Sequence, residues 1–402
     1  MKHRLVVLGL SAGLLGFVVG SLDPLSADRS RSDQATATPA LGVRVIADLL
    51  AGRDYFGVVQ RAAMDCMGQV AYLATPSTLY RVENGQAQPL AERPEENARL
   101  QLAPGGGMFA WLLPEPAVQG LYTVRLMQIP DRRLAELRLA AFPFGFAALY
   151  LGFEGKLIVT ASPLDDWHGF QGRVQYTFWD TQGMVLKEVV FPTHQLGVLD
   201  PSGTSILFLG QAEAVAFSAA GDELWRLPGR FRKAAIADSG RFALLNPAAS
   251  DAIDQVHVFS GPGQPLVIRV ATPVHHLVAT PDGSEAVIVG DAGRYFSFDR
   301  ASGTAQEAPP LPLGGTFYVM DAEFVDADSL AFGVLQRVGQ PPNVTWPTAT
   351  IAILDRGGRL AFQRDFPVEE PSASEPAIDL TFGGCSFVGF THDNTIIAAF
   401  ER

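Results

Sequence analysis

Apolar segments along most of the chain come in pairs that flank a short polar turn. The segments after these turns are rich in Val, Ile, Leu, Phe and Ala, as in 286–289 and 396–400. This composition is typical of β-strands buried on both faces. Turns of this first type occur eight times, at 65–68, 104–107, 153–155, 200–203, 238–240, 281–283, 326–328 and 392–394.

A second type of turn alternates with the first, where an alternating apolar strand ends in a small or acidic residue and a glycine turn. It occurs seven times, at 79–85, 178–183, 217–221, 259–263, 298–303 and 354–357 and, in a degenerate form without the glycine, at 126–132. Two hairpins per unit of ~40–50 residues predict the four-stranded antiparallel blades of an all-β propeller. A sandwich or tandem β-domains would not require the two hairpin types to alternate from end to end.

Two stretches resemble known propeller repeats. The turn Pro281-Asp282-Gly283, followed by Phe298-Asp299 and Gly303, resembles WD40-like and YVTN-type propellers. The segment 217–221 followed by Trp225 is similar to the quinoprotein blade pattern. The resemblance covers roughly residues 55–402 and implies architecture rather than chemistry.

The number of blades follows from the two turn counts. Eight first turns against seven second turns favour a single propeller of eight blades, whose last blade takes an outer strand from the N-terminal segment Gly42–Leu49. This closure would avoid a frayed edge where the ring ends. Seven blades plus a C-terminal hairpin is the alternative.

The N-terminus has the pattern of an export signal. Met1-Lys2-His3-Arg4 precedes the apolar run 5–20, and Ser26-Ala27 offers a cleavage point. The run is shorter than the ~20 residues that cross a bilayer comfortably, and no later run approaches that length. We therefore expect a periplasmic or secreted protein with a signal peptide at 1–27, a linker at 28–40 and the propeller at 41–402, with no membrane span after signal removal.

Charge and composition limit the partners. With 48% hydrophobic and 18% charged residues, disorder is excluded for most of the chain. Loss of residues 1–27 removes Lys2, Arg4 and Asp23 and changes the net charge from −12 to −13. Such a surface repels nucleic acid, and it favours a protein partner with a basic surface.

The two cysteines, Cys66 and Cys385, lie near opposite ends of the mature chain. In an eight-bladed register they would be offset by about 23 Å along neighbouring inner strands. A disulfide needs Cα atoms within ~7 Å, so we expect two free thiols.

The longest connections indicate where a partner would bind. They lie at 113–121, 163–172, 246–255, 336–348 and 367–376, all on one face of the predicted ring, and together carry a net charge of −7. Function concentrates in such loops, although loop length alone costs little stability. The candidate partner-binding residues are Asp165, Asp166, Trp167, His168, Trp346, Glu369 and Glu370.

No catalytic residue, metal ligand or cofactor site is predicted. Asp165-Asp166-Trp167-His168 is the one tight cluster of potential ligands, and we interpret it as a solvated loop. His275 and His276 are adjacent on a strand, so their side chains point to opposite faces. Gly9-Leu10-Ser11-Ala12-Gly13 matches GxSxG but lies inside the export signal.

These features predict an exported, non-catalytic binding module that holds a protein partner on a loop-rich acidic face. The alternative is an enzyme or enzyme subunit. It rests on resemblance to propellers that serve as heavy subunits of amine dehydrogenases or as metal-assisted lactonases.

Overall fold

The computed structural model describes most of the chain from residue 43 onward. The described ranges are 43–48, 61–64, 70–75, 78–83, 86–95, 97–116, 120–130, 132–142, 148–165, 171–261, 263–326, 329–338, 345–367, 378–382, 387–391 and 395–399. Cys66 and Cys385, the linker and the export signal lie outside them.

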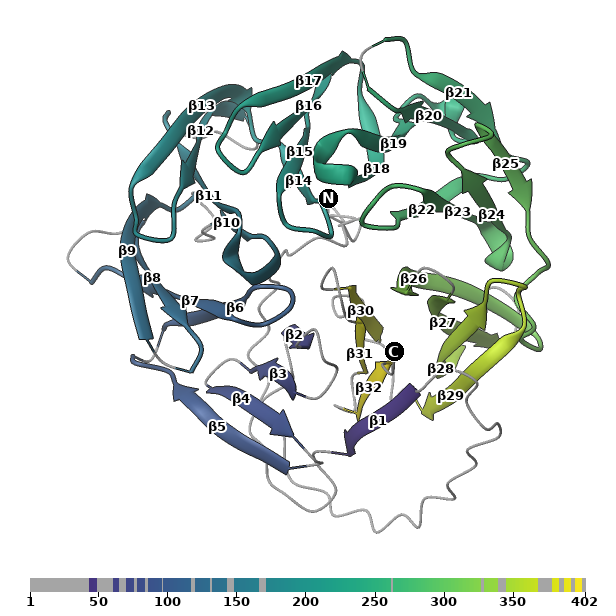
Figure 1. The fold of residues 1–402 in the computed structure, drawn as a ribbon, viewed down its shortest axis with the longest axis horizontal. Coiled ribbons are helices and arrows are strands. Elements are labelled where there is room, and N and C mark those ends of the chain that lie inside the picture. Colours follow the sequence, from purple (N-terminus) through teal and green to yellow (C-terminus); the bar gives the residue numbers. More distant parts are fainter. Residues whose placement is uncertain are drawn as a thin grey trace, which may run out of the picture.

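Four-stranded antiparallel sheets stand around a common axis like the blades of a propeller (Figure 1). In the first half of the ring the sheets are formed by β2 (Arg61–Met64), β3 (Val70–Ala74), β4 (Thr78–Glu83) and β5 (Gln86–Glu92); β6 (Arg99–Leu102), β7 (Met108–Pro114), β8 (Leu121–Gln128) and β9 (Arg132–Ala140); β10 (Ala148–Leu151), β11 (Ile158–Pro163), β12 (Gln171–Trp179) and β13 (Val185–Thr193); and β14 (Leu196–Leu199), β15 (Ser205–Leu209), β16 (Glu213–Ser218) and β17 (Glu223–Pro228).

The chain continues around the ring in the same order. The next sheets are formed by β18 (Phe231–Ala237), β19 (Phe242–Pro247), β20 (Gln255–Phe259) and β21 (Leu266–Arg269); β22 (Val274–Ala279), β23 (Glu285–Gly290), β24 (Tyr295–Asp299) and β25 (Thr304–Glu307); and β26 (Thr316–Asp326), β27 (Ser329–Val338), β28 (Thr345–Asp355) and β29 (Leu360–Pro367).

The helices among the described residues are four single 3-10 turns, η1 (Phe153–Gly155), η2 (Asp238–Gly240), η3 (Ser250–Ala252) and η4 (Asp291–Gly293). Each has three residues, so none is long enough to cross a membrane.

The remaining sheet combines the two ends of the chain. Its strand order is β1 (Val43–Asp48), β32 (Thr395–Ala399), β31 (Phe387–Thr391) and β30 (Ile378–Phe382). β1 lies within the segment Gly42–Leu49 and pairs antiparallel with β32, from Val43 opposite Ala399 to Asp48 opposite Thr395. This sheet closes the ring between β26–β29 and β2–β5 (Figure 1).

The prediction of a propeller of eight blades is wrong: the described chain forms seven blades of four consecutive strands, β2 to β29, and its two ends share the remaining sheet. Seven first-type turns join the first two strands of a blade, but 392–394 joins β31 to β32 and opens no blade. The seven second-type turns match the seven blades made of consecutive strands, β2 to β29. The described residues after β29 form three strands, too few for another such blade. The alternative prediction, seven blades plus a C-terminal hairpin, gives the correct number of blades. However, the described C-terminal residues form three strands, β30 to β32, and not the two strands of a hairpin.

The core lies in the inner strands, where neighbouring sheets face each other. β15 and β7 are buried along almost their whole length, as their continuous apolar sequences predict, whereas the outermost strands β13 and β25 are largely exposed. An aromatic cluster joins two blades, with Tyr176 of β12 and Phe208 of β15 at 4.4 Å between ring centroids. Burial of these rings is a large contribution to stability.

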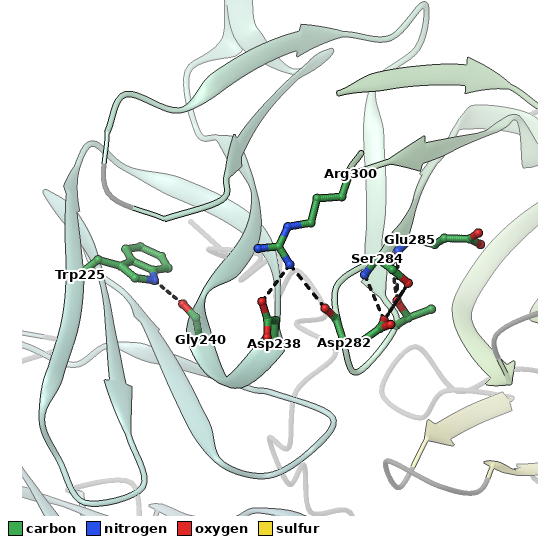
Figure 2. A network of polar contacts seen from close by, with 8 residues as sticks. Trp225, Asp238, Gly240, Asp282, Ser284, Glu285 and Arg300 are labelled. Atoms are coloured by element: carbon green, nitrogen blue, oxygen red, sulfur yellow. Dashed lines mark hydrogen bonds and ion pairs between the residues drawn. The ribbon is translucent and has the colours of Figure 1, made fainter. Parts of the chain in front are cut away.

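Side chains in the short turns also connect neighbouring blades (Figure 2). Trp225 of β17 donates its indole N–H to the carbonyl of Gly240 in the next blade at 2.5 Å. Arg300, in the turn after β24, pairs with Asp238 of the preceding blade at 2.9 Å. Arg356 occupies the equivalent turn position one blade later and pairs back to Glu285. The arginine that follows Asp in the second-type turns at 298–303 and 354–357 therefore links adjacent blades.

Candidate partner-binding face

The long connections share one side of the ring. In each blade the first and third turns lie on one side, here called the turn face. The connections between second and third strands, and between blades, lie on the opposite side, here called the loop face. The five long connections join β7 to β8, β11 to β12, β19 to β20, β27 to β28 and β29 to β30, so they all belong to the loop face.

Asp165 is the one predicted site residue whose side chain the structure describes. Its carboxylate accepts two bonds from the Arg173 guanidinium, at 2.7 Å and 3.0 Å, and one from the Arg173 backbone N–H at 3.0 Å. These bonds hold the pKa of Asp165 down to about 2. A carboxylate engaged in this way anchors the base of the β11–β12 loop instead of standing free for a partner.

The other predicted site residues are less fully described. Asp166, Trp167, His168, Glu369 and Glu370 lie outside the described residues. Trp346 belongs to β28, so its predicted place in a loop is wrong; the alternating sequence Thr345–Asp355 continues as one long strand. Of the predicted site residues, the described part of the chain therefore places only Asp165, beside β11, and Trp346, in β28, which belong to different blades.

Arginines on neighbouring strands offset part of the negative charge of the loop face. Glu115 accepts a hydrogen bond from Thr123 at 2.8 Å and lies 3.7 Å from Arg138. Asp254 pairs with Arg269 at 3.3 Å. The net charge of −7 refers to the loop residues alone. It does not include Arg138 and Arg269, which belong to the adjacent strands β9 and β21. Locally the loop face is less acidic than its loop sequences suggest.

A shallow, mainly apolar depression of about 430 Å³ lies on the loop face. It is formed by the link between β17 and β18 and by the beginning of the β19–β20 connection. Its lining residues are Pro228, Gly229, Arg230, Phe231, Pro247, Ala248, Ala249 and His257. The depression was not predicted because its two segments are separated in the chain; prolines at 228 and 247 are the local signal in the sequence.

Backbone contacts fix the shape of this depression. Gly229 has a φ of +129° and donates its N–H to the Ala212 carbonyl at 2.7 Å, while Ala248 donates to the Arg230 carbonyl at 2.8 Å. Phe231 is buried, and its ring meets the edge of His257 at 5.8 Å. Burial lowers the pKa of His257, so its imidazole is neutral at pH 7. The depression is therefore largely uncharged, and Arg230, which is exposed, is the one charged residue among those that line it.

Buried titratable residues elsewhere in the described chain, such as His194 and Asp200, pack against or bond to neighbouring residues. His194 is packed 5.2 Å from Phe142, and burial lowers its pKa to about 4. Asp200, whose pKa burial raises, accepts bonds from the Ser202 N–H at 2.8 Å and the Ser205 hydroxyl at 3.0 Å. Within the part of the chain that the structure describes, no three His, Cys, Asp or Glu residues are grouped so that they could hold a metal.

Comparison with known proteins identifies the architecture. No family profile and no curated protein sequence matches the chain. The C-terminal WD40 domain of Sif2 matches with 10% identity and a TM-score of 0.56, over 90% of this chain and 99% of that one. Chaetomium thermophilum Sqt1, bound to the N-terminus of the ribosomal protein L10, matches with 14% identity and a TM-score of 0.56, over 89% and 99%. Saccharomyces cerevisiae Sqt1 matches with 10% identity and a TM-score of 0.53, over 87% and 97%.

At these identities the likeness concerns the fold alone. It confirms the predicted resemblance to WD40-like propellers and assigns no specific family.

Proposed function

We propose that this protein is a non-catalytic propeller that binds a protein partner through the loop face, and that it does so after export. The observation that carries the proposal is the apolar depression between β17–β18 and β19–β20. Exposed apolar surface rimmed by polar residues is a common mark of protein interaction sites. The structurally similar Sqt1 is itself a propeller bound to the N-terminal segment of another protein, which supports the same mode of use.

The partner we propose has a basic surface and inserts an apolar side chain into the depression. The net charge of −13 that remains after loss of residues 1–27 attracts a basic partner at long range and raises the rate of encounter. Close contact then depends on the depression, because Asp165 and Asp254 already have arginine partners.

Blocking the depression should abolish partner capture. In Ala249→Arg, a long charged side chain is placed at an exposed position of the rim whose backbone is extended, so the variant should fold normally. We expect the tagged wild-type protein to capture a defined partner from its native cell envelope, and Ala249→Arg to lose it. Partner capture is also measured for Trp346→Ala and for a double variant with Glu369→Ala and Glu370→Ala, because these residues were predicted to contact the partner.

The matched control is Ala301→Arg, which makes the same change at an exposed position on the turn face. It should retain the partner. Repetition at high salt should slow or weaken capture as ions screen the long-range attraction. Equal capture by Ala249→Arg and the wild type would exclude the depression as the binding site.

The proposed export is tested separately, by the mass of the mature protein. Intact mass determination of the protein purified from its native source should give a chain that begins after residue 27. A mature protein that retains Met1–Ala27 would contradict the proposed processing.

An enzyme remains the alternative function. It would be favoured by a stoichiometric metal ion or a visible chromophore in the protein purified from its native source.

A further inference from the structure

The depression on the loop face has one charged side chain at its rim. Arg230, in the link between β17 and β18, lines the depression and is exposed. The next residue, Phe231, is buried and lines it too, together with prolines and alanines of the two segments. A single cation therefore stands beside an apolar hollow.

The guanidinium of Arg230 is not neutralised by the protein. It makes no hydrogen bond or ion pair with any residue that the structure describes. Arg173 and Arg269, also on the loop face, pair with carboxylates at 2.7 Å and 3.3 Å. The backbone of Arg230 is held, because its carbonyl accepts the N–H of Ala248 at 2.8 Å. The side chain thus starts from a fixed position and is available to a ligand.

Carboxylates on the loop-face ends of the surrounding elements do not compensate this charge. Glu213, at the start of β16, bonds to Arg226 at 2.6 Å. Asp254, just before β20, pairs with Arg269. Asp251 in η3 is exposed and is not among the residues that line the depression. Among the described residues, the rim of the depression therefore carries an uncompensated positive charge on a chain whose net charge is negative.

We propose that the depression binds the C-terminal residue of the partner, whose apolar side chain enters the hollow while its terminal carboxylate pairs with Arg230. This inference rests on the proposed function and names the part of the partner that is recognised. A guanidinium matches a carboxylate with two parallel, charge-assisted hydrogen bonds, which are stronger than neutral ones. A volume of about 430 Å³ is at the small end of the range for binding sites, so it suits one or two residues of a chain end.

The sign of the charge selects this end of the partner chain. Arg230 would repel an N-terminal ammonium group or a lysine side chain, whereas it attracts an α-carboxylate. A partner with a basic surface has few acidic side chains to offer, but its C-terminus carries a carboxylate whatever its composition. Sqt1 holds the N-terminus of another protein. In this chain the exposed cation favours the opposite end, and capture of a C-terminal carboxylate is a recurring mode of peptide recognition.

Fluorescence anisotropy of the full chain with labelled peptides tests the inference. The first probe is a pentapeptide of alternating lysine and alanine that ends in leucine with a free carboxylate, and the second is its C-terminal amide. We expect the wild type to bind the free acid about tenfold to a hundredfold more tightly than the amide, the difference made by one charge-assisted hydrogen bond. In Arg230→Gln, an exposed substitution that should fold normally, this preference should disappear.

A third probe separates a chain end from an acidic side chain. It is the amidated peptide with glutamate immediately before leucine, and we expect it to bind no more tightly than the plain amide. Ala249→Trp places a bulky, neutral side chain at the exposed rim and should abolish binding of all the peptides. The matched control is Arg241→Gln, the same change at an exposed arginine of the turn face between β18 and β19. It should keep the full preference for the free acid.

Equal affinity of the wild type for the free acid and the amide, or no binding of the free acid, would overturn recognition of the C-terminus. An undiminished preference in Arg230→Gln, or tight binding of the glutamate peptide, would do the same. Failure of the proposed function is a different result, namely capture of the cellular partner by Ala249→Arg as by the wild type.

Discussion

Replacing Phe208 by Ala should lower the free energy of unfolding by about 3–5 kcal/mol, the usual cost of removing a buried aromatic ring. Phe208 is 0% exposed and contacts Tyr176 and Phe191 of the preceding blade, with ring centroids at 4.4 Å and 5.7 Å. It also meets Phe217 of its own blade at 5.9 Å. The substitution would leave a cavity between two blades, where neither sheet can move without disturbing the next.

Urea denaturation followed by tryptophan fluorescence and circular dichroism measures this loss. The control is Val190→Ala on β13, whose side chain is 50% exposed, and which should change stability by less than about 0.5 kcal/mol. A loss for Phe208→Ala no larger than that of the control would mean that the interface between these blades is not tightly packed.

Replacing Gly203 by Ala should cost about 2–5 kcal/mol of stability. Gly203 closes the turn between β14 and β15 with a φ of +69°, a conformation that costs other residues about 1–2 kcal/mol. A Cβ at this position would lie 2.1 Å from the backbone N of Phe153 in the preceding blade. Because that neighbour is backbone, the clash cannot be relieved by rotating a side chain, and overpacking adds to the conformational cost.

The variant Gly120→Ala separates the cost of the backbone conformation from the cost of the steric clash. Gly120 has a φ of +83°, but a Cβ there would meet nothing within 4 Å. This variant should lose only the conformational part, about 1–2 kcal/mol, in the same denaturation experiment. Equal losses for the two glycines would show that close packing between the turns of neighbouring blades contributes nothing.

The alternating pattern of apolar strands and polar turns predicted the architecture well. Each of the seven second-type turns lies between the third and fourth strands of a blade, as at 298–303 and 354–357. Such turns are specified locally, by a strand that ends in Asp or a small residue and then glycine, so they can be recognised without knowledge of the fold.

The number of repeats was harder to predict because the ends of the chain share one sheet. The turn 392–394 has the same composition as the first-type turns, although it joins β31 to β32. Its position in a sheet depends on pairing between β32 and β1, strands about 350 residues apart in sequence. Local composition carries no information about such a pairing.

For the candidate site, too, local sequence predicted one part of the arrangement, and contacts between residues distant in sequence decided the rest. Loop sequences identified the side of the ring with the long connections and the acidic residues on it, but Asp165 and Glu115 have partners on strands that fold back beside them. Adjacent His275 and His276 were predicted to point to opposite faces of a strand, yet both lie near β26: the His275 ring is 5.9 Å from that of Tyr318, and the His276 imidazole is 3.2 Å from the Val319 carbonyl. These contacts could not be predicted, since β22 and β26 belong to different blades.

The sequence by itself determined the all-β class, the alternation of two hairpin types and the side on which the long connections emerge, because each depends on residues close together in the chain. Only the tertiary structure decided how the ring closes, which charges are paired and where the apolar depression lies. These features depend on contacts between blades, and the free energy of such contacts is set by packing and burial that no local pattern records.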